Sequence, residues 1–304
     1  MRVTANMSAD SSIYNIQQGR KRLDKLQETI SSNQNINRPS DDPISSRLLL
    51  DIGDKIKASD QYNTNMVNAT TWMKIADTAL SGMNDTMLQA RTIMNSIISG
   101  SSDPTQRQLV HNQLIEFKKQ IVDMANTQYG DQYVFGGANN LVPPFNETDN
   151  TYAGDGTERQ IEIAQGATQT ISVSGDRLLQ GVGTDPSYGS TDVLQTFDDL
   201  IAAVGDTTTP SDAAAIDTAV QSLYLASRQI INAVNTNISR MVRVDNMSKL
   251  NVNNKNTLIG IAGNIQNPDL VKLGVQLSSE NNAFQASLAS TAKLSQLSLL
   301  DYLK

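Results

Sequence analysis

The sequence predicts a mainly α-helical protein, an elongated antiparallel helical or coiled-coil rod with a small β-rich insertion domain. Three observations predict this class. Apolar residues recur in a long heptad pattern, three helix starts carry a proline signature, and residues alternate in polarity in one region only. The heptad pattern starts at Met66 and Ala69 and stays apolar for more than four repeats, as in a helix lying along a partner helix. Counted in sevens, its positions are Met66, Met73, Leu80, Met87 and Met94, then Ala69, Ala76, Met83, Ala90 and Ile97.

The composition restricts the class of protein. Hydrophobic residues make up 38% of the 304 residues and aromatic residues only 5%, which suits long helices better than one large globular core. A net charge of -7 argues against a general nucleic-acid binder. No apolar run approaches 18 residues, so we expect no membrane insertion. The beginning, from Met1 to Asn6, does not resemble a cleaved secretory signal, and zero cysteine excludes disulfides and thiolate metal sites.

The N-terminal segment carries a short second heptad pattern. Ile16, Leu23, Leu26 and Ile30 follow one another at steps of seven, three and four. A basic cluster of Arg20, Lys21, Arg22 and Lys25 lies among them and is interpreted as a solvated helix face. The segment has no cap, so its helix should be marginal in isolation, and the polar run over residues 31–35 predicts a linker.

The next stretch is Arg38-Pro39-Ser40-Asp41-Asp42-Pro43, a helix-start motif. Asp42 can cap a helix whose first residue is Pro43, since proline has no N–H to leave unpaired there. The same device recurs at Asp103-Pro104 and Asn267-Pro268-Asp269. We therefore expect helices to begin at these three places, and the first of them to end near Gly100.

The helix opened by Pro104 has a seam that continues the rod. The short connection over residues 100–102 implies that this helix lies antiparallel to the methionine-rich helix. The residues assigned to the rod seam are Met66, Met73, Leu80, Met87, Met94, Val110, Leu114, Phe117 and Ile121. A methionine stripe also suits a ligand groove, but this period favours packing.

The β signal lies between the helices. Tyr133-Val134-Phe135 before Gly136-Gly137 predicts a strand and a turn, and Pro143-Pro144 predicts a loop. Ile161 and Ile163, then Ile171 and Val173, alternate with polar residues on either side of Gln165-Gly166. This predicts a hairpin. Residues 138–188 would form a small β-rich outer domain between rod segments 38–137 and 189–267.

Helical periodicity resumes near Thr191. Seven aspartates but no lysine or arginine occur from Leu178 to Ser227, and without calcium-loop spacing they are interpreted as a solvated acidic face. A third seam follows at Ile216, Val220, Leu223, Ile230, Val234, Met241 and Val244, with Ser227 and Asn237 in the same frame. Polar seam positions weaken packing but fix register.

The last helix carries a weak apolar face that continues at Leu294, Leu297 and Leu300. Together with the N-terminal face it suggests that terminal helices at 1–37 and 268–304 pair on assembly. The residues assigned to self-assembly are Ile16, Leu23, Leu26, Ile30, Leu273, Leu277, Phe284 and Leu288.

Enzyme chemistry is not indicated. The only histidine, His111, follows a seam residue and has no cysteine or second histidine as partner. Gly181-Val182-Gly183 precedes no lysine, so it is a poor phosphate-loop match, and no Gly-x-Ser-x-Gly elbow is present. We expect no catalytic residue, no cofactor and no metal.

The layout resembles the flagellin family, in particular its members that join hook to filament. Residues 38–43 resemble the Asn-Pro-Ser-Asp-Asp-Pro of those members, with Arg38 in place of Asn, whereas flagellin proper has Ala-Ala-Gly after the aspartates. Tyr133-Val134-Phe135-Gly136-Gly137, with Pro144-Phe145 following, is similar to a Tyr-Ile-Phe-Gly/Ala-Gly segment of the family. Residues 152–161 and the Leu288–Leu300 end are also similar, while residues 180–215 match nothing.

The resemblance implies a secreted structural subunit of the bacterial flagellum, exported without a cleaved signal peptide. It would assemble with copies of itself in a ring or helical axial assembly between the proximal junction protein and flagellin, after carriage by an export chaperone. Two alternatives remain open. The chain could be a flagellin filament subunit, or a cytoplasmic coiled-coil adaptor whose β insertion is the binding module.

Overall fold

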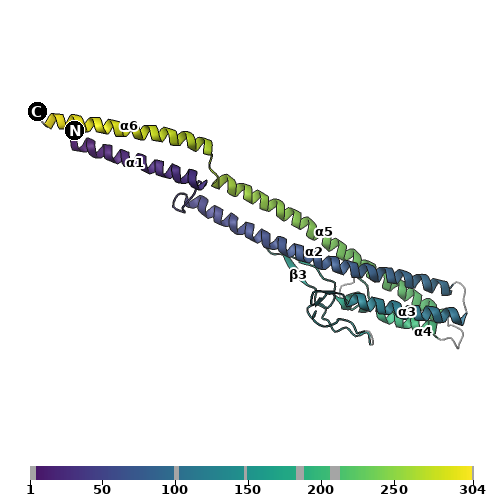
Figure 1. The fold of residues 1–304 in the computed structure, drawn as a ribbon. Coiled ribbons are helices and arrows are strands. Elements are labelled where there is room, and N and C mark those ends of the chain that lie inside the picture. The colour runs from purple at the N-terminus through teal and green to yellow at the C-terminus, as the bar shows by residue number, and fades with distance from the viewer. Residues whose placement is uncertain (1–4, 99–102, 147–148, 183–187, 206–212, 303–304) are drawn as a thin grey trace. The chain divides into compact units, whose positions relative to one another are not determined.

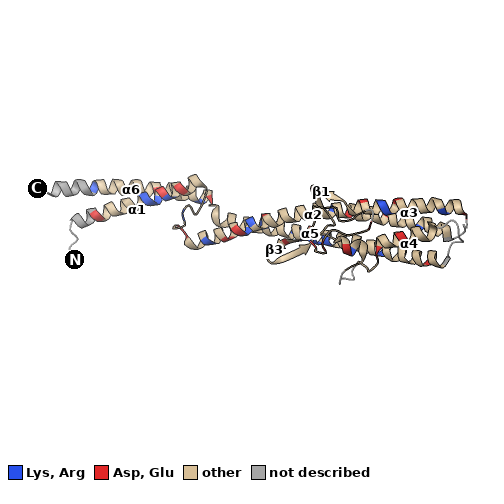
Figure 2. Cartoon of the chain, turned by 90° about the horizontal axis from the view of Figure 1, so that it is seen from below, with Lys and Arg blue, Asp and Glu red and all other residues tan. Residues whose placement is uncertain are grey.

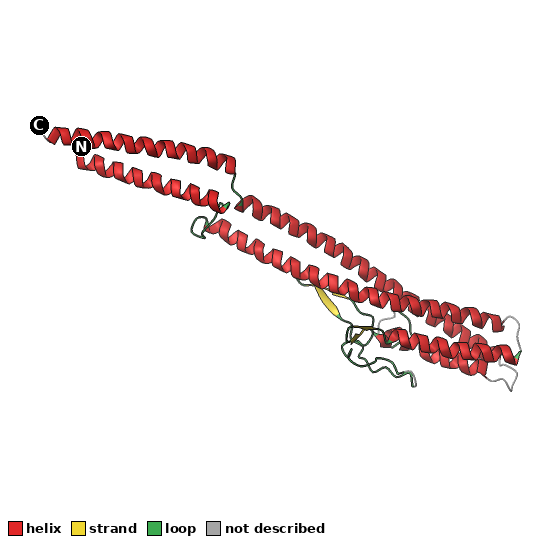
Figure 3. Ribbon diagram, viewed as in Figure 1, coloured by secondary structure: helices red, strands yellow, loops and turns green. Residues whose placement is uncertain are grey.

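The computed structural model describes residues 5–98, 103–146, 149–182, 188–205 and 213–302. These residues form six α-helices, one π-helix and two small antiparallel sheets (Figures 1 and 3). The predicted class, mainly helical with a small β region, is confirmed. The elements are α1 (Ala5–Ser32), α2 (Pro43–Ile98), α3 (Pro104–Ala125), β1 (Gln128–Tyr129), β2 (Gln132–Tyr133), β3 (Gln160–Ala164), β4 (Ala167–Thr170), η1 (Asp176–Gln180), α4 (Val193–Gly205), α5 (Ala213–Gln266) and α6 (Leu270–Tyr302).

Two of the three helix starts are as predicted. Asp42 Oδ1 accepts from the backbone N–H groups of Ile44 and Ser45 at 3.1 and 3.0 Å. Asp103 accepts from Thr105 N–H at 3.0 Å, one residue after Pro104. The third start needs a correction, because Asp269 caps α6 and Pro268 lies before the helix. A carboxylate reaches the N–H groups two and three residues ahead, so the residue before Leu270 is the cap.

The chain divides into two compact units. One, here called the terminal unit, comprises Met1–Ala58 and Asn254–Lys304. The other, the central unit, comprises Ser59–Asn253. Helices α2 and α5 contribute residues to both units.

The predicted rod seam forms the core of the central unit. All nine residues are buried except Phe117, which is partly buried against the same cluster. Leu80, Met87 and Met94 pack with α3, α4 and α5, while Met66 and Met73 share a second cluster with the β3–β4 hairpin and Val244. Close approach is marked at Gly82, where a Cβ would lie 2.5 Å from Met124 Sδ. The antiparallel α2–α3 pair is confirmed.

Polar pairs fix the register of α2 against α5. Ser59 Oγ donates to Asn251 Oδ1 at 2.5 Å, and Asn251 Nδ2 returns a bond to Ser59 O at 2.7 Å. Ser248 donates to Asn63 at 3.0 Å. Asn237, a polar position of the third predicted seam, is buried and donates to Met73 O at 3.0 Å. Each step forward on α2 is matched by a similar step back on α5, as in an antiparallel pair.

The strand predictions are right in place and too long in extent. The first strand is Gln132–Tyr133, which pairs with β1, while Val134 and Phe135 leave the sheet and enter the helical core. The predicted hairpin exists, with Gln165 and Gly166 at its turn and Gly166 at φ 71°. Its second strand ends at Thr170, so Ile171 and Val173 lie beyond it. There Ile171 N–H still donates to Arg159 O at 2.9 Å, whereas Arg159 N–H donates to the Ser172 side-chain oxygen at 2.7 Å.

The acidic stretch has two faces. Helix α4 buries Val193, Leu194, Phe197, Leu200 and Val204 in the central core. Asp198 binds Lys118 of α3 at 2.6 Å, whereas Asp199 and Asp217 are exposed, as predicted for a solvated acidic face. Asp185, Asp206 and Asp212 lie outside the described residues.

Candidate functional site: the terminal helix pair and its loop

Within the terminal unit, α1 and α6 lie side by side and antiparallel (Figures 1 and 2). The structure brings together the two faces assigned to self-assembly. Leu23 is buried and Leu288 is exposed. The others, which are Ile16, Leu26, Ile30, Leu273, Leu277 and Phe284, are partly buried. The side chains of Leu294, Leu297 and Leu300 lie outside the described part of the structure.

Two contacts join α1 to α6, and a third joins the loop after α1 to the connection between α5 and α6. Gly19 is buried, and a Cβ there would lie 3.3 Å from Cδ2 of Phe284. Arg22 Nε lies 3.2 Å from Glu280 Oε2. Beyond the end of α1, Asn35 N–H donates to Gln266 O at 2.7 Å, and its amide reaches Asn267 O at 3.1 Å. The loop after α1 is thus bonded to the connection between α5 and α6.

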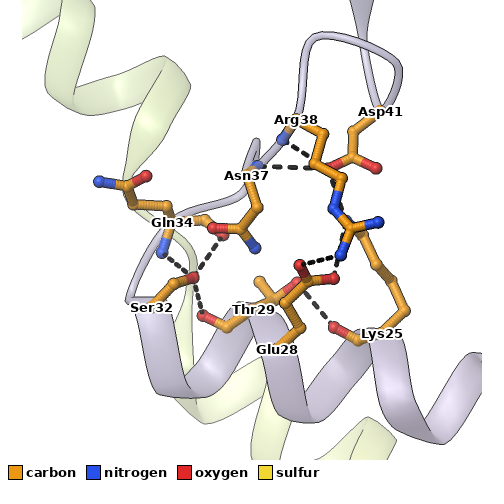
Figure 4. A network of polar contacts seen from close by, with 8 residues as sticks. All are labelled: Lys25, Glu28, Thr29, Ser32, Gln34, Asn37, Arg38 and Asp41. Carbon is orange, nitrogen blue, oxygen red and sulfur yellow. Dashed lines mark hydrogen bonds and ion pairs between the residues drawn. The ribbon is translucent and has the colours of Figure 1, made fainter.

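The loop over residues 33–42 folds back on the last turns of α1 (Figure 4). Helix α1 ends at Ser32, and Asn33 has φ 52°, the left-handed conformation that commonly closes a helix. Lys25 Nζ binds Asp41 Oδ2 at 2.6 Å, and Arg38 binds Glu28 at 3.3 Å. These two ion pairs join the second half of the loop to one helical turn of α1. We call Lys25, Glu28, Arg38 and Asp41 the loop clamp.

The carboxylates of the helix-start motif are held in the charged form. The pKa of Asp41 is lowered first by Lys25 and then by the backbone N–H groups of Arg38 and Asn37. The pKa of Asp42 is lowered by the N–H and hydroxyl of Ser45 and by Ile44 N–H. The two adjacent aspartates therefore do different work. Asp41 closes the loop, and Asp42 caps α2.

The remaining motif residues lie at the surface. Pro39, Ser40 and Pro43 are exposed. Beside them, a groove runs between the loop, the first turns of α2 and the last turns of α5, all in the terminal unit. Its apolar lining includes Ile36, Leu49, Ile52 and Ile56.

Apolar side chains remain uncovered in the terminal unit. Val271 is 80% exposed and Val275 68%, on a different face of α6 from Phe284. On α2, Ile44 is 82% exposed, and Leu48 and Leu50 follow it. Apolar surface of this kind, gathered on one small unit, is typical of interaction sites.

Some contacts of this site were not predicted from the sequence. Lys25 and Arg22 were interpreted as a solvated face, but both form ion pairs, while Arg20 and Lys21 are exposed as expected. The partners of Lys25 and Asn35 are distant in sequence, and no spacing rule reveals them. Gly19 offered one signal, since some glycines inside helices lie at close packing contacts, although Gly53, Gly260 and Gly274 have open space beside them.

Other chemistries find no support in the part of the chain described here. The described residues contain no group of three or more histidine, aspartate or glutamate side chains placed to hold a metal ion. No described helix is long and apolar enough to cross a membrane. His111 Nδ1 lies 3.1 Å from Ile201 O, so the single histidine makes a contact between α3 and α4.

Comparison with known proteins gives the class first. Residues 3–140 match the family described as the bacterial flagellin N-terminal helical region. That range contains α1, the loop clamp, and the whole of α2 and α3 with the rod seam. The resemblance to flagellin-type proteins is therefore confirmed.

Comparisons that extend over most of the chain point to particular relatives. It is 22% identical over 258 residues to flagellar hook-associated protein 3 of Escherichia coli, covering 83% of this chain and 80% of that protein. The protein of that name from Salmonella typhimurium is 21% identical over 211 residues, covering 67% of each. Among solved structures, a flagellar hook-associated protein of Vibrio parahaemolyticus has a TM-score of 0.65 at 23% identity, covering 75% of this chain and all of that one. Bacillus cereus FlgL has a TM-score of 0.58 at 18% identity, covering 70% and 99%. These two likenesses establish the fold.

Proposed function

We propose that the protein is a structural subunit of the bacterial flagellum that joins hook to filament by axial self-assembly. Both curated relatives are named flagellar hook-associated protein 3, and the alignment with the first extends over most of both chains. The helix-start motif with Asp41-Asp42-Pro43, which flagellin proper lacks, favours this function over that of a filament subunit.

The observation that carries the proposal is the terminal unit. Its two terminal helices pair with each other and still leave Val271, Val275 and Ile44 exposed. Covering exposed apolar residues with further copies removes their surface from water and lowers the free energy of the assembly. Such a chain suits a ring or helical assembly, in which the exposed apolar surface of each copy is covered by its neighbours.

The proposal includes partners and location. The subunit would lie outside the cell in the flagellum, between a proximal junction protein and flagellin, after delivery by an export chaperone. It would act as a structural subunit and not as an enzyme.

The test is a strain that lacks the gene. Electron micrographs should show hooks without filaments, and flagellin should appear as monomers in the medium. A plasmid copy of the unaltered gene is the control and should restore filaments. Filaments of normal number in the deletion strain would refute the junction role, and a cell without hooks would place the protein earlier in assembly.

A further inference from the structure

Helix α5 carries a second apolar stripe that faces away from the core. Tyr224, Ile231 and Ile238 follow one another at steps of seven, and Val242 lies one turn further on. All four are exposed, Tyr224 by 46%. Each of the first three directly follows a buried residue of the inner seam, namely Leu223, Ile230 and Asn237. A helix with two heptad stripes is built to contact partners on two sides. We call Tyr224, Ile231, Ile238 and Val242 the outer stripe.

The N-terminal end of the outer stripe is flanked by two basic side chains. Arg91 of α2 lies over the Tyr224 ring, 5.0 Å from its centroid, and Arg228 lies 6.0 Å from it. Neither arginine forms an ion pair with another residue in the described ranges. Two unneutralised cations around an exposed ring, in a chain of net charge -7, form a surface suited to an acidic partner.

The same unit carries an exposed carboxylate, Asp199, on one face of α4, here called the acidic face of α4. On α4, Gln195, Asp199 and Ala202 are exposed at steps of four and three. Asp199 accepts from Gln195 Nε2 at 2.8 Å and, among the described residues, has no cationic partner. Ala202 is small, so an aromatic ring can approach this face closely.

The two surfaces lie near the same end of the helical bundle. Tyr224 follows the start of α5 at Ala213 by roughly 16 Å of helix, and Asp199 precedes the end of α4 at Gly205 by roughly 9 Å. Helix α4 packs on α3, whereas the basic cluster belongs to α2 and α5. Parallel copies placed side by side can therefore bring the two surfaces together at similar height.

We propose that the outer stripe, with Arg91 and Arg228, binds the acidic face of α4 on a second copy of this chain. This inference rests on the proposed axial assembly and names one of its contacts. Because the two surfaces differ, the contact is heterologous, and such contacts repeat into rings or helices and do not stop at pairs. Arg228 would face Asp199 of the neighbour, and Ile231 and Ile238 would extend the contact along it.

A charge exchange tests the pairing. In the deletion strain, Arg228→Glu and Asp199→Lys should each lower the number of filaments per cell by roughly fivefold or more, because like charges then meet across the contact. The double variant should restore filaments. Arg243→Glu, an exposed arginine on the same helix outside the stripe, is the matched control and should be silent. Thermal unfolding of each purified variant should be unchanged.

A cysteine pair tests the geometry, since the natural chain has no cysteine. Oxidised flagella from cells with Arg228→Cys and Asp199→Cys in one chain should yield a ladder of dimers, trimers and larger products. Either single variant should yield none. Dimers from Arg228→Cys alone would mean symmetric pairing, and a product with another flagellar protein would mean a different occupant. Either result, or single charge variants that assemble normally, would overturn the contact. Filaments of normal number in the deletion strain would instead refute the junction role on which this inference rests.

Discussion

Phe284 of α6 lies against the backbone of Gly19 of α1, so closely that a Cβ at position 19 would stand 3.3 Å from its ring. The most specific contact between the terminal helices thus joins an aromatic ring to a residue without a side chain. One side of the ring packs on Gly19, and the remainder is partly exposed. The ring therefore contributes both to the helix pair and to the surface that other copies can cover.

Phe284→Asp should abolish the junction and leave the central unit folded. A carboxylate at this position carries a desolvation cost wherever it is covered, and the central unit does not depend on it. The measurement compares filament formation in cells with the melting transition of the purified variant. Val275→Asp, on the exposed face of the same helix, is the comparison that separates the two faces of α6. Cells with Phe284→Asp that swim normally would remove this residue from assembly, and early melting of the core would place it inside the fold.

Leu80→Ala should lower the free energy of unfolding by about 2–5 kcal/mol, because Leu80 is fully buried in the central core. Chemical denaturation of the purified monomer measures the change. Leu88→Ala on the same helix is the matched control, since Leu88 is 45% exposed and should change stability little. Equal midpoints for both variants would contradict the packing of α2 described above.

Glu158→Gln should destabilise the central unit by about 1–3 kcal/mol. Its carboxylate lies 3.2 Å from Arg240 and 3.7 Å from Arg177, all three side chains being largely buried, and a neutral amide would remove the charge that attracts both guanidinium groups. Glu116→Gln, on the exposed face of α3, is the control. Denaturation curves that coincide for the two variants would show that the arginines find other partners.

The loop clamp should open in acid. The folded state lowers the pKa of Asp41, so the charged carboxylate stabilises the loop above its unfolded value of about 3.9 and the stabilisation is lost as pH falls through the lower folded value. The Asn37 and Arg38 amides donate to Asp41, and their protection factors, which compare the measured exchange rate with the intrinsic rate at the same pH, should fall as the pH drops below about 4. Asp41→Asn should show fast exchange at every pH, and Asp51→Asn should behave as the unaltered chain. Protection of these amides in Asp41→Asn would exclude the carboxylate as the closing group.

Periodicity allowed the helices to be predicted from the sequence, because seam spacing is a local property of one helix. Met66–Met94 and Ile216–Val244 were placed in this way, and Asp42 and Asp103 fixed two starts. The strand ends were not predictable in the same manner. Ile171 and Val173 alternate as a strand would, yet they lie beyond β4: Ile171 N–H still donates to Arg159 O at 2.9 Å, and the two side chains are buried in different clusters.

The candidate site was predictable only in its apolar half. Leu23, Leu277 and Phe284 follow from spacing, whereas the clamp depends on where a loop returns. Lys25 meets Asp41 across 16 residues, and Asn35 meets Gln266 across more than 200. The outer stripe also has heptad spacing in the sequence. It was not recognised because each of its first three residues directly follows a residue of the inner seam.

The polar pairs between α2 and α5 bear on mechanical load. Ser59–Asn251, Asn63–Ser248 and Met73–Asn237 lie along the central unit at matched intervals. A slide of one helix past the other by a single turn, about 5.4 Å, would break all three together and leave the Asn237 amide buried without an acceptor. Apolar methionine packing alone would resist such sliding weakly, since its contacts re-form at each turn. The asparagine hydrogen bonds therefore oppose sliding of α2 along α5, so that a shear force applied to one helix is transmitted to the other.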